Sequence, residues 1–238
     1  MSNGWDESAP AWLADMGASG DYARVHVLDP PMLARVRGRG FATALDVGCG
    51  EGRFCRMLRG LGVFPVGLDP TRALLEAARQ RDPGGEYCHG RAEALPFADG
   101  RFDLVVSYLT LIDIADARAA IAEMARVLRP GGALLIANLT SFLTAAASPD
   151  GWASGPDGVE RFALDRYAEE RADWVQWRGI RIRNWHRPLG MYMSLLLDQG
   201  LALRHFEEPM PQGGDPDRGA RYRRVPWFLV MEWRKPRA

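Results

Sequence analysis

The residues best suited to chemistry form a glycine-rich turn that follows a short apolar run. Gly48, Gly50 and Gly52 alternate along the chain just after Asp46. Glycine accepts left-handed backbone at little cost, so such a turn can bring backbone N–H groups and a helix N-terminus against a ligand. The carboxylate of Asp46 favours a ligand that carries a cationic group. A dinucleotide fingerprint would need glycine in place of Arg53, so the spacing disfavours a nicotinamide dehydrogenase.

A second carboxylate stands where the next parallel strand is expected to end. Apolar residues 64–68 predict that strand, and Asp69 follows it, 17 positions after Gly52. A carboxylate at such a strand end can accept two hydrogen bonds from a ribose diol. Asp69, with Pro70 and Thr71, is also suited to cap the following helix, which is the alternative role.

The patterns around these motifs indicate an α/β domain. Residues 43–47 and 102–107 predict buried strands, and apolar residues recur at helical spacing over 52–61 and 116–128. A proline and two glycines end the second of these helices, and residues 133–139 predict the next strand. Alternating strands and helices of this kind are typical of a mainly parallel sheet.

Together these motifs resemble the class I S-adenosylmethionine-dependent methyltransferases of the small-molecule type. The glycine turn, the strand-end carboxylate, residues 90–97 and residues 124–132 occur in the family's order over 42–138. The resemblance implies a Rossmann-like, seven-stranded mixed sheet with helices on both faces, an N-terminal lid and a cap inserted between strands five and six. It also implies S-adenosyl-L-methionine as cofactor and S-adenosyl-L-homocysteine as product. Arg91 departs from the family, which often has an acidic side chain there.

By the same resemblance, the leading segment covers the cofactor, and Tyr22 and Arg24 hold its methionine carboxylate. Arginine suits a two-pronged grip on a carboxylate, and ordinary packing is the alternative for both residues. The backbone of Ala92 or the carboxylate of Glu93 would serve the adenine. The predicted cofactor contacts are Tyr22, Arg24, Asp46, Gly48, Cys49, Gly50, Asp69, Pro70, Arg91, Ala92, Glu93, Ser107 and Tyr108.

The acceptor side is less defined, because methyl transfer depends mainly on alignment of the reacting atoms. A base is needed only if the acceptor must lose a proton, as a hydroxyl does and a carboxylate does not. His186 is the first candidate because histidine titrates near neutrality, and Tyr108 and Asp113 are its rivals. Trp185, His186 and Arg187 are predicted to bind the acceptor, with Arg187 holding an anionic part. Helix capping or packing on Trp185 is the alternative for His186.

A single domain is expected over residues 1–238. Residues 167–182 suggest a short helix followed by a strand, and residues 215–219 suggest a loop. Most of the eight tryptophans are expected to form a core for the non-sheet segments. The predicted parts are an N-terminal lid (1–40), a cofactor-binding core (41–140), a substrate cap (141–188), and a closing helix and strands (189–238).

Composition limits the possible partners. The 238 residues carry 30 basic and 30 acidic side chains, so no global field attracts nucleic acid. Cys49, Cys55 and Cys88 fit neither a disulfide set nor a metal-binding spacing, and no metal is expected. The N-terminus lacks a signal-peptide pattern, and no apolar run reaches the ~20 residues of a membrane span. We therefore expect a cytoplasmic monomer or homodimer with no membrane or nucleic-acid partner.

The leading hypothesis is methylation of a small molecule, at oxygen of a hydroxyl or carboxylate. One alternative is an N-methyltransferase of a small molecule. A nucleic-acid or protein methyltransferase is another, and the basic residues within 218–224 are its main support. A non-catalytic cofactor-binding protein is the third, and Arg91 is the residue that favours it.

Overall fold

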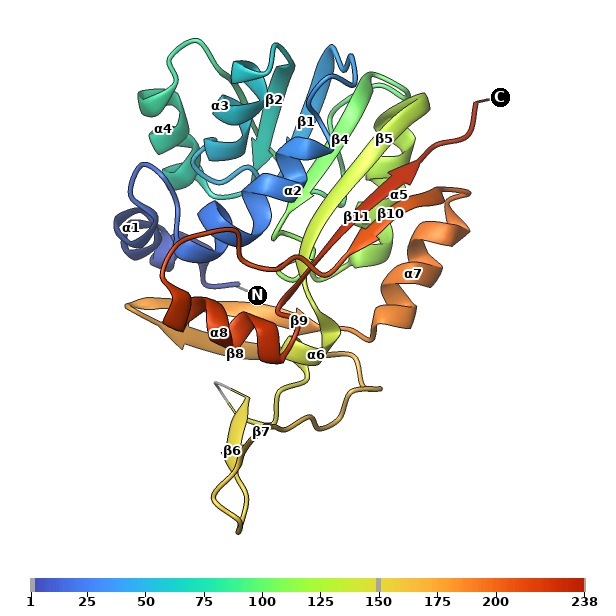
Figure 1. The fold of residues 1–238 in the computed structure, drawn as a ribbon. Coiled ribbons are helices and arrows are strands. Elements are labelled where there is room, and N and C mark those ends of the chain that lie inside the picture. Colours follow the sequence, from blue (N-terminus) through green and yellow to red (C-terminus); the bar gives the residue numbers. More distant parts are fainter. Residues whose placement is uncertain (1–2, 149–150, 238) are drawn as a thin grey trace.

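The computed structural model describes residues 3–148 and 151–237, and a seven-stranded sheet forms its centre (Figure 1). The strand order is β10-β11-β5-β4-β1-β2-β3, and β11 runs antiparallel to both of its neighbours. The predicted Rossmann-like mixed sheet is thereby confirmed. The strands are β1 (Thr43–Val47), β2 (Phe64–Asp69), β3 (Glu86–His89), β4 (Phe102–Tyr108), β5 (Leu128–Leu139), β10 (Ala202–Glu207) and β11 (Phe228–Arg234).

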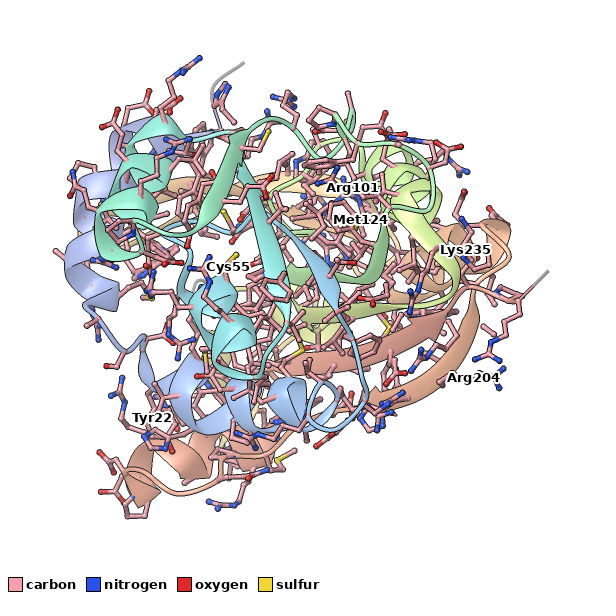
Figure 2. All side chains as sticks on the ribbon, turned by 90° about the horizontal axis from the view of Figure 1, so that it is seen from above. Tyr22, Cys55, Arg101, Met124, Arg204 and Lys235 are labelled. Carbon is pink, nitrogen blue, oxygen red and sulfur yellow. The ribbon has the colours of Figure 1, made fainter. Side chains whose placement is uncertain are left out.

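Helices cover both faces of this sheet, because its central strands are apolar on both sides. β4 is buried along nearly its whole length, as expected for a strand inside a parallel sheet. Helices α2 and α3, with the π-helical segment η1, pack on one face, and α5 and α7 pack on the other. Figure 2 shows α2 and α5 on opposite sides of the strands. The bounds are η1 (Ala23–Leu28), α2 (Asp29–Ala34), α3 (Arg53–Gly60), α4 (Arg72–Arg81), α5 (Ala117–Val127) and α7 (Leu189–Asp198).

The cap consists of the segments between β5 and α7. The β8–β9 hairpin crosses the carboxyl end of the sheet, and the β6–β7 hairpin projects away from the body (Figure 1). Helix α1 packs against β9 through a small core of Ala9, Trp12, Ile180 and Ile182. The N-terminal segment and the cap therefore form one layer. The bounds are α1 (Trp5–Met16), α6 (Ser141–Thr144), β6 (Trp152–Ser154), β7 (Glu160–Phe162), β8 (Arg171–Trp177) and β9 (Ile180–His186).

Two local predictions were wrong. The expected short helix within 167–182 is strand β8, because the alternation of apolar and polar residues follows the two-residue period of a strand. The expected loop 215–219 opens helix α8 (Pro216–Arg224) instead. Asp215 caps that helix by accepting hydrogen bonds from the N–H groups of Asp217 and Arg218. Within the described ranges, no helix is both long and apolar enough to span a bilayer.

Candidate active site

A cavity of about 940 Å³ lies at the carboxyl ends of β1, β2 and β4, between the sheet and the cap. The chain leaves β1 for β2 on one side and later places β4 on the other. Adjacent connections diverge at such a point and leave a crevice above the strand ends. Helix α1 and the β8–β9 hairpin contribute to the opposite wall.

The glycine turn forms the floor of this cavity. Gly48, Gly50 and Gly52 all have positive φ, at 75°, 54° and 75°. A Cβ at Gly48 would collide with the side chain of Thr110, whereas at Gly50 the nearest atom is in the ring of Trp12, at 3.5 Å. Gly50 therefore leaves its backbone open to a ligand, and Gly48 permits the close contact with the segment after β4.

Asp46 is a buried carboxyl with an unsatisfied oxygen. Its Oδ2 accepts a hydrogen bond from the Cys55 thiol at 3.4 Å, and its Oδ1 has no hydrogen-bond partner among the described residues. Burial raises the pKa of Asp46 to about 7, and the nearby carboxyls of Asp69 and Glu51 add to the rise. A cationic ligand group at this oxygen would offset the cost of burying the charge.

Asp69 links the glycine turn to the end of β2. Its Oδ2 accepts the N–H of Gly50 at 2.9 Å, and its Oδ1 accepts the N–H of Thr71 at 2.8 Å. Burial raises the pKa of Asp69, and these two hydrogen bonds oppose the rise. A carboxylate has about four lone-pair sites, so Asp69 keeps capacity for the hydroxyls of a diol while it shapes the turn.

Of the two predicted residues in the N-terminal segment, Arg24 lines the cavity and Tyr22 does not. Arg24 lines the cavity, and its Nη1 donates to Asp21 at 2.8 Å. Tyr22 does not line it, because its hydroxyl donates to the carbonyl of Asp215 at 3.1 Å and its ring packs on Tyr222. The predicted cofactor contact of Tyr22 stays a prediction, and this position outside the cavity lining does not support it.

Arg53 lines the cavity, although it was not among the predicted site residues. In the sequence it served only as evidence against a dinucleotide-binding motif. Its guanidinium forms an ion pair with Asp29, and its Nε donates to the carbonyl of Ser19 at 2.6 Å. Tyr108 donates its hydroxyl to the same Asp29 at 2.9 Å. Burial and Asp29 raise the pKa of Tyr108 well above its ordinary value, which favours the protonated phenol and disfavours Tyr108 as the base.

The segment after β3 lies at the cavity as predicted. Cys49, Pro70, Arg91, Ala92 and Glu93 all line the wall. The unusual Arg91 pairs with Glu93 at 2.8 Å while its side chain remains mostly exposed. Exposed pairs of this kind contribute little to stability, so Arg91 can turn toward a ligand at small cost.

Asp113 is the carboxyl that faces the cap. Asn184 on β9 donates to its Oδ1 at 2.6 Å, and the Trp5 side chain of α1 is a further hydrogen-bond partner. Burial raises the pKa of Asp113 to about 8 in spite of both hydrogen bonds. Three separate segments of the chain thus meet at one carboxyl group, which lines the cavity.

His186 also lines the cavity, but both of its ring nitrogens are engaged. Its Nε2 lies 2.8 Å from the carbonyl of Tyr167, which can only accept, so Nε2 carries the proton. Its Nδ1 then accepts the hydroxyl of Thr144 at 2.7 Å. Burial lowers the pKa of His186, which keeps the ring neutral. His186 can therefore reach an acceptor only through Thr144.

Besides Tyr22, three predicted residues lie outside the cavity lining. Ser107 is fully buried inside β4. The strand period of β9 points Asn184 and His186 to one face and Trp185 to the other, where its ring packs on Arg187. Arg187 is completely buried, and its guanidinium donates to Glu170 at 2.6 Å and to the carbonyl of Ala115 at 2.7 Å. These positions do not support the predicted substrate roles of Trp185 and Arg187 or the predicted cofactor role of Ser107.

Comparison with known proteins identifies the family of this chain. Residues 45–136 match the family model described as a methyltransferase domain. A demethylmenaquinone methyltransferase of Beutenbergia cavernae is 31% identical over 168 residues, which cover 59% of this chain and 67% of that protein. An S-adenosylmethionine-dependent methyltransferase structure from Mesorhizobium loti has a TM-score of 0.76 at 27% identity, over 92% of this chain and 100% of that one. The chain belongs to the S-adenosylmethionine-dependent methyltransferases.

The curated relatives also include acyl-carrier-protein enzymes. A malonyl-[acyl-carrier protein] O-methyltransferase of Serratia marcescens is 36% identical over 128 residues, which cover 52% of this chain and 50% of the relative. The chain spans about half the length, or less, of the malonyl-[acyl-carrier protein] O-methyltransferases that it matches. The family membership therefore rests on the relative that the chain covers to two thirds and on the structural likeness over most of the chain.

Proposed function

We propose that this protein transfers the methyl group of S-adenosylmethionine to a small-molecule acceptor. The observation that carries the proposal is the pair of buried carboxyls, Asp46 and Asp69, on either side of the glycine turn in one cavity. The unsatisfied Oδ1 of Asp46 suits the cofactor's ammonium group, and Asp69 suits its ribose diol. Arg24 would hold the methionine carboxylate, and Ala92 and Glu93 would lie beside the adenine.

The cavity has room for an acceptor beside the cofactor. Its volume of about 940 Å³ lies near the upper end of the roughly 300–1,000 Å³ found for small-molecule sites. The bound cofactor supplies a methyl carbon activated by a sulfonium, whose sulfur keeps the bonding electron pair as the new bond forms. The protein must then align the acceptor and exclude water, and the cap formed by α1 and β8–β9 covers the strand ends for this purpose.

We infer that oxygen of a hydroxyl is the methylated atom and that Asp113 takes its proton. Asp113 lies on the cavity wall with its orientation fixed by Asn184, whereas both nitrogens of His186 are engaged. The O-methyltransferase names of the malonyl relatives support oxygen. Basic residues of α8 give little support to a nucleic-acid substrate, because Arg218 and Arg224 lie over the rings of Tyr22 and Trp152.

Thermal unfolding with S-adenosylmethionine, S-adenosylhomocysteine and NAD tests the cofactor. A hundredfold excess over Kd stabilises by about 2.7 kcal/mol, which is a rise of roughly 5–10 °C in Tm for a chain of this size. Both adenosyl compounds should produce this rise in the wild type and not in Asp69→Ala. Asp99→Ala, a change of an exposed aspartate away from the cavity, is the control and should keep it. A rise with NAD alone, or none at all, would contradict the proposal.

A further inference from the structure

The cap side of the cavity has its own chemical character. We define the acceptor wall as the cavity-lining residues within 139–148, 173–186 and 222–228, together with Asp113. These residues come from the end of β5, from α6, from the β8–β9 hairpin and from the start of β11. They face the glycine turn and the carboxyl ends of β1 and β2, where the cofactor is proposed to bind.

Aromatic rings stand at two ends of the acceptor wall. Trp177 on β8 lines the cavity and remains 38% exposed. Trp174 also borders the cavity, but it lies on the same face of the hairpin as Trp185, and the guanidinium of Arg181 covers its ring at 4.0 Å from the centroid. At the other end, Tyr222, Trp227 and Phe228 form a cluster, with Tyr222 and Trp227 ring centroids 4.8 Å apart. Apolar surface left open inside a concave site marks a place for an apolar ligand. Rings on two sides of the cavity favour a flat molecule.

The acceptor wall holds no arginine or lysine among its described residues. Its ionisable members are two carboxyls, Asp113 and Asp173, with His186 and Tyr222. Arg171 is near but does not line the cavity, because it donates to Asp173 at 2.9 Å and to the carbonyl of Thr144 at 3.3 Å. A carboxylate acceptor would enter a wall with two carboxyls and no cation, and its lost hydration would be left uncompensated.

The arginines that do line the cavity belong to the cofactor side. Each of them is already paired with a carboxylate of its own segment or a neighbouring one. They are Arg24 with Asp21, Arg53 with Asp29, and Arg91 with Glu93. Arg24 is assigned to the cofactor carboxylate, and Arg53 is held by Asp29. Arg91 can leave its exposed pair, but it follows β3 in the segment proposed for the adenine and is not part of the acceptor wall.

The polar groups of the acceptor wall suit a neutral hydroxyl. Asp113, held by Asn184, has lone pairs that can accept an O–H. The hydroxyl of Thr144, which donates to His186, can accept or orient the same group from the other side. Burial raises the pKa of Asp113 to about 8, which agrees with a site built for neutral partners.

We propose that the acceptor is a flat, largely apolar molecule that carries a hydroxyl and no carboxylate, an aromatic alcohol rather than an acid. This inference rests on the proposed function and narrows its acceptor class. It also separates this chain from relatives named for a malonyl group, since a malonyl group carries a carboxylate. The hydroxyl lies toward Asp113, and the ring system lies against Trp177 of β8.

Isothermal titration calorimetry with matched probes tests the class. The protein is saturated with S-adenosylhomocysteine and titrated with 2-naphthol and with 2-naphthoate, and both titrations are repeated without S-adenosylhomocysteine. The naphthol should bind at least tenfold more tightly than the naphthoate. Equal or tighter binding of the naphthoate overturns the proposal, as does failure of both probes to bind at millimolar concentration. Failure of S-adenosylhomocysteine to bind would instead count against the proposed function.

Two variants test the residues that carry the argument. Trp177→Ala should weaken naphthol binding at least fivefold and leave S-adenosylhomocysteine binding unchanged. Phe206→Ala removes a similarly exposed ring on β10, outside the cavity lining, and should change neither affinity. Asp173→Asn removes a carboxylate from the wall and releases Arg171 from its ion pair, so it should strengthen naphthoate binding at least threefold. Unchanged affinities in both Trp177→Ala and Asp173→Asn would overturn the proposal.

Discussion

At the scale of single residues, burial raises the pKa values of three aspartates that line the cavity. Asp46, Asp69 and Asp113 all have raised pKa values, with burial as the largest cause in each case. The charge of Asp69 also raises the pKa of the other two. Such a cluster costs stability in the empty protein, and groups of this kind gather at functional sites. A cationic cofactor is the partner that offsets the cost.

The base assignment leads to a prediction for Asp113. Because the ionised carboxyl takes the proton, kcat/KM should rise with pH to a midpoint at or below about 8, since the cofactor's positive charge favours ionisation. Asp113→Asn should lose this rise and about 10²–10⁴-fold in kcat. Kinetics between about pH 6 and about pH 9 with an acceptor found by screening measure both effects.

A second carboxyl of the wall supplies the control for that experiment. Asp173→Asn changes a half-exposed carboxyl on β8 and should keep the pH profile. If His186→Gln abolished the rise and Asp113→Asn kept it, proton removal would pass through Thr144 and His186 instead.

At the scale of elements, the cap is attached to the segment after β4 by one buried cation. Arg187 donates to the carbonyls of Leu111, Ile114 and Ala115 and to the carboxylate of Glu170. These bonds fix the position of β9 and therefore of Asn184, which holds Asp113. Arg187, which was predicted to bind substrate, thus positions the wall that is proposed to bind it.

Removal of that cation should loosen the cap. Arg187→Ala leaves three carbonyls without their donor, so the free energy of unfolding should fall by about 3 kcal/mol in urea titrations. Arg118→Ala, at an exposed pair 3.8 Å from Asp198, should change it by less than about 0.5 kcal/mol. Equal effects of the two changes would show that Arg187 does not anchor the cap.

At the scale of the whole molecule, the buried carboxyls make stability depend on pH. The pKa values of Asp46 and Asp113 are about 7 and about 8 in the folded protein, against a usual 3.8. The folded state holds protons that the unfolded chain has released, so the stability that these groups contribute is lost as pH rises through about 4 to 8. Glu232 acts oppositely: Arg39 and Arg35 lower its pKa to about 2 in spite of its burial, so its contribution is lost only on acidification below about 4.5.

The free energy of unfolding should therefore fall between about pH 6 and about pH 8, by on the order of 1–3 kcal/mol. Urea unfolding at a series of pH values measures the slope. Asp113→Asn should flatten it, and saturating S-adenosylhomocysteine should do so as well, because its ammonium favours ionised Asp46. A flat profile in the wild type would contradict the raised pKa values.

Local patterns in the sequence predicted the part of the molecule that is proposed to bind the cofactor. The glycine turn, Asp46 and Asp69 lie within consecutive strand–turn–helix units, so the strand ends and the turn follow from residues close in the chain. Short apolar runs also marked β1, β2, β4 and the second half of β5, whereas the complete seven-stranded sheet was implied by the resemblance to the family.

The tertiary structure decided the acceptor side. Asp113 meets Asn184 across 71 positions, and Thr144 meets His186 across 42. Trp185 points away from the cavity because of the register of the β8–β9 hairpin. A shift of this register by one residue would move every side chain of the strand to the opposite face. Such contacts arise from the packing of the cap on the sheet, and no local pattern encodes them. The sequence by itself thus determined the strand ends and the glycine turn proposed to hold the cofactor, and only the tertiary structure brought together the residues proposed to hold the acceptor.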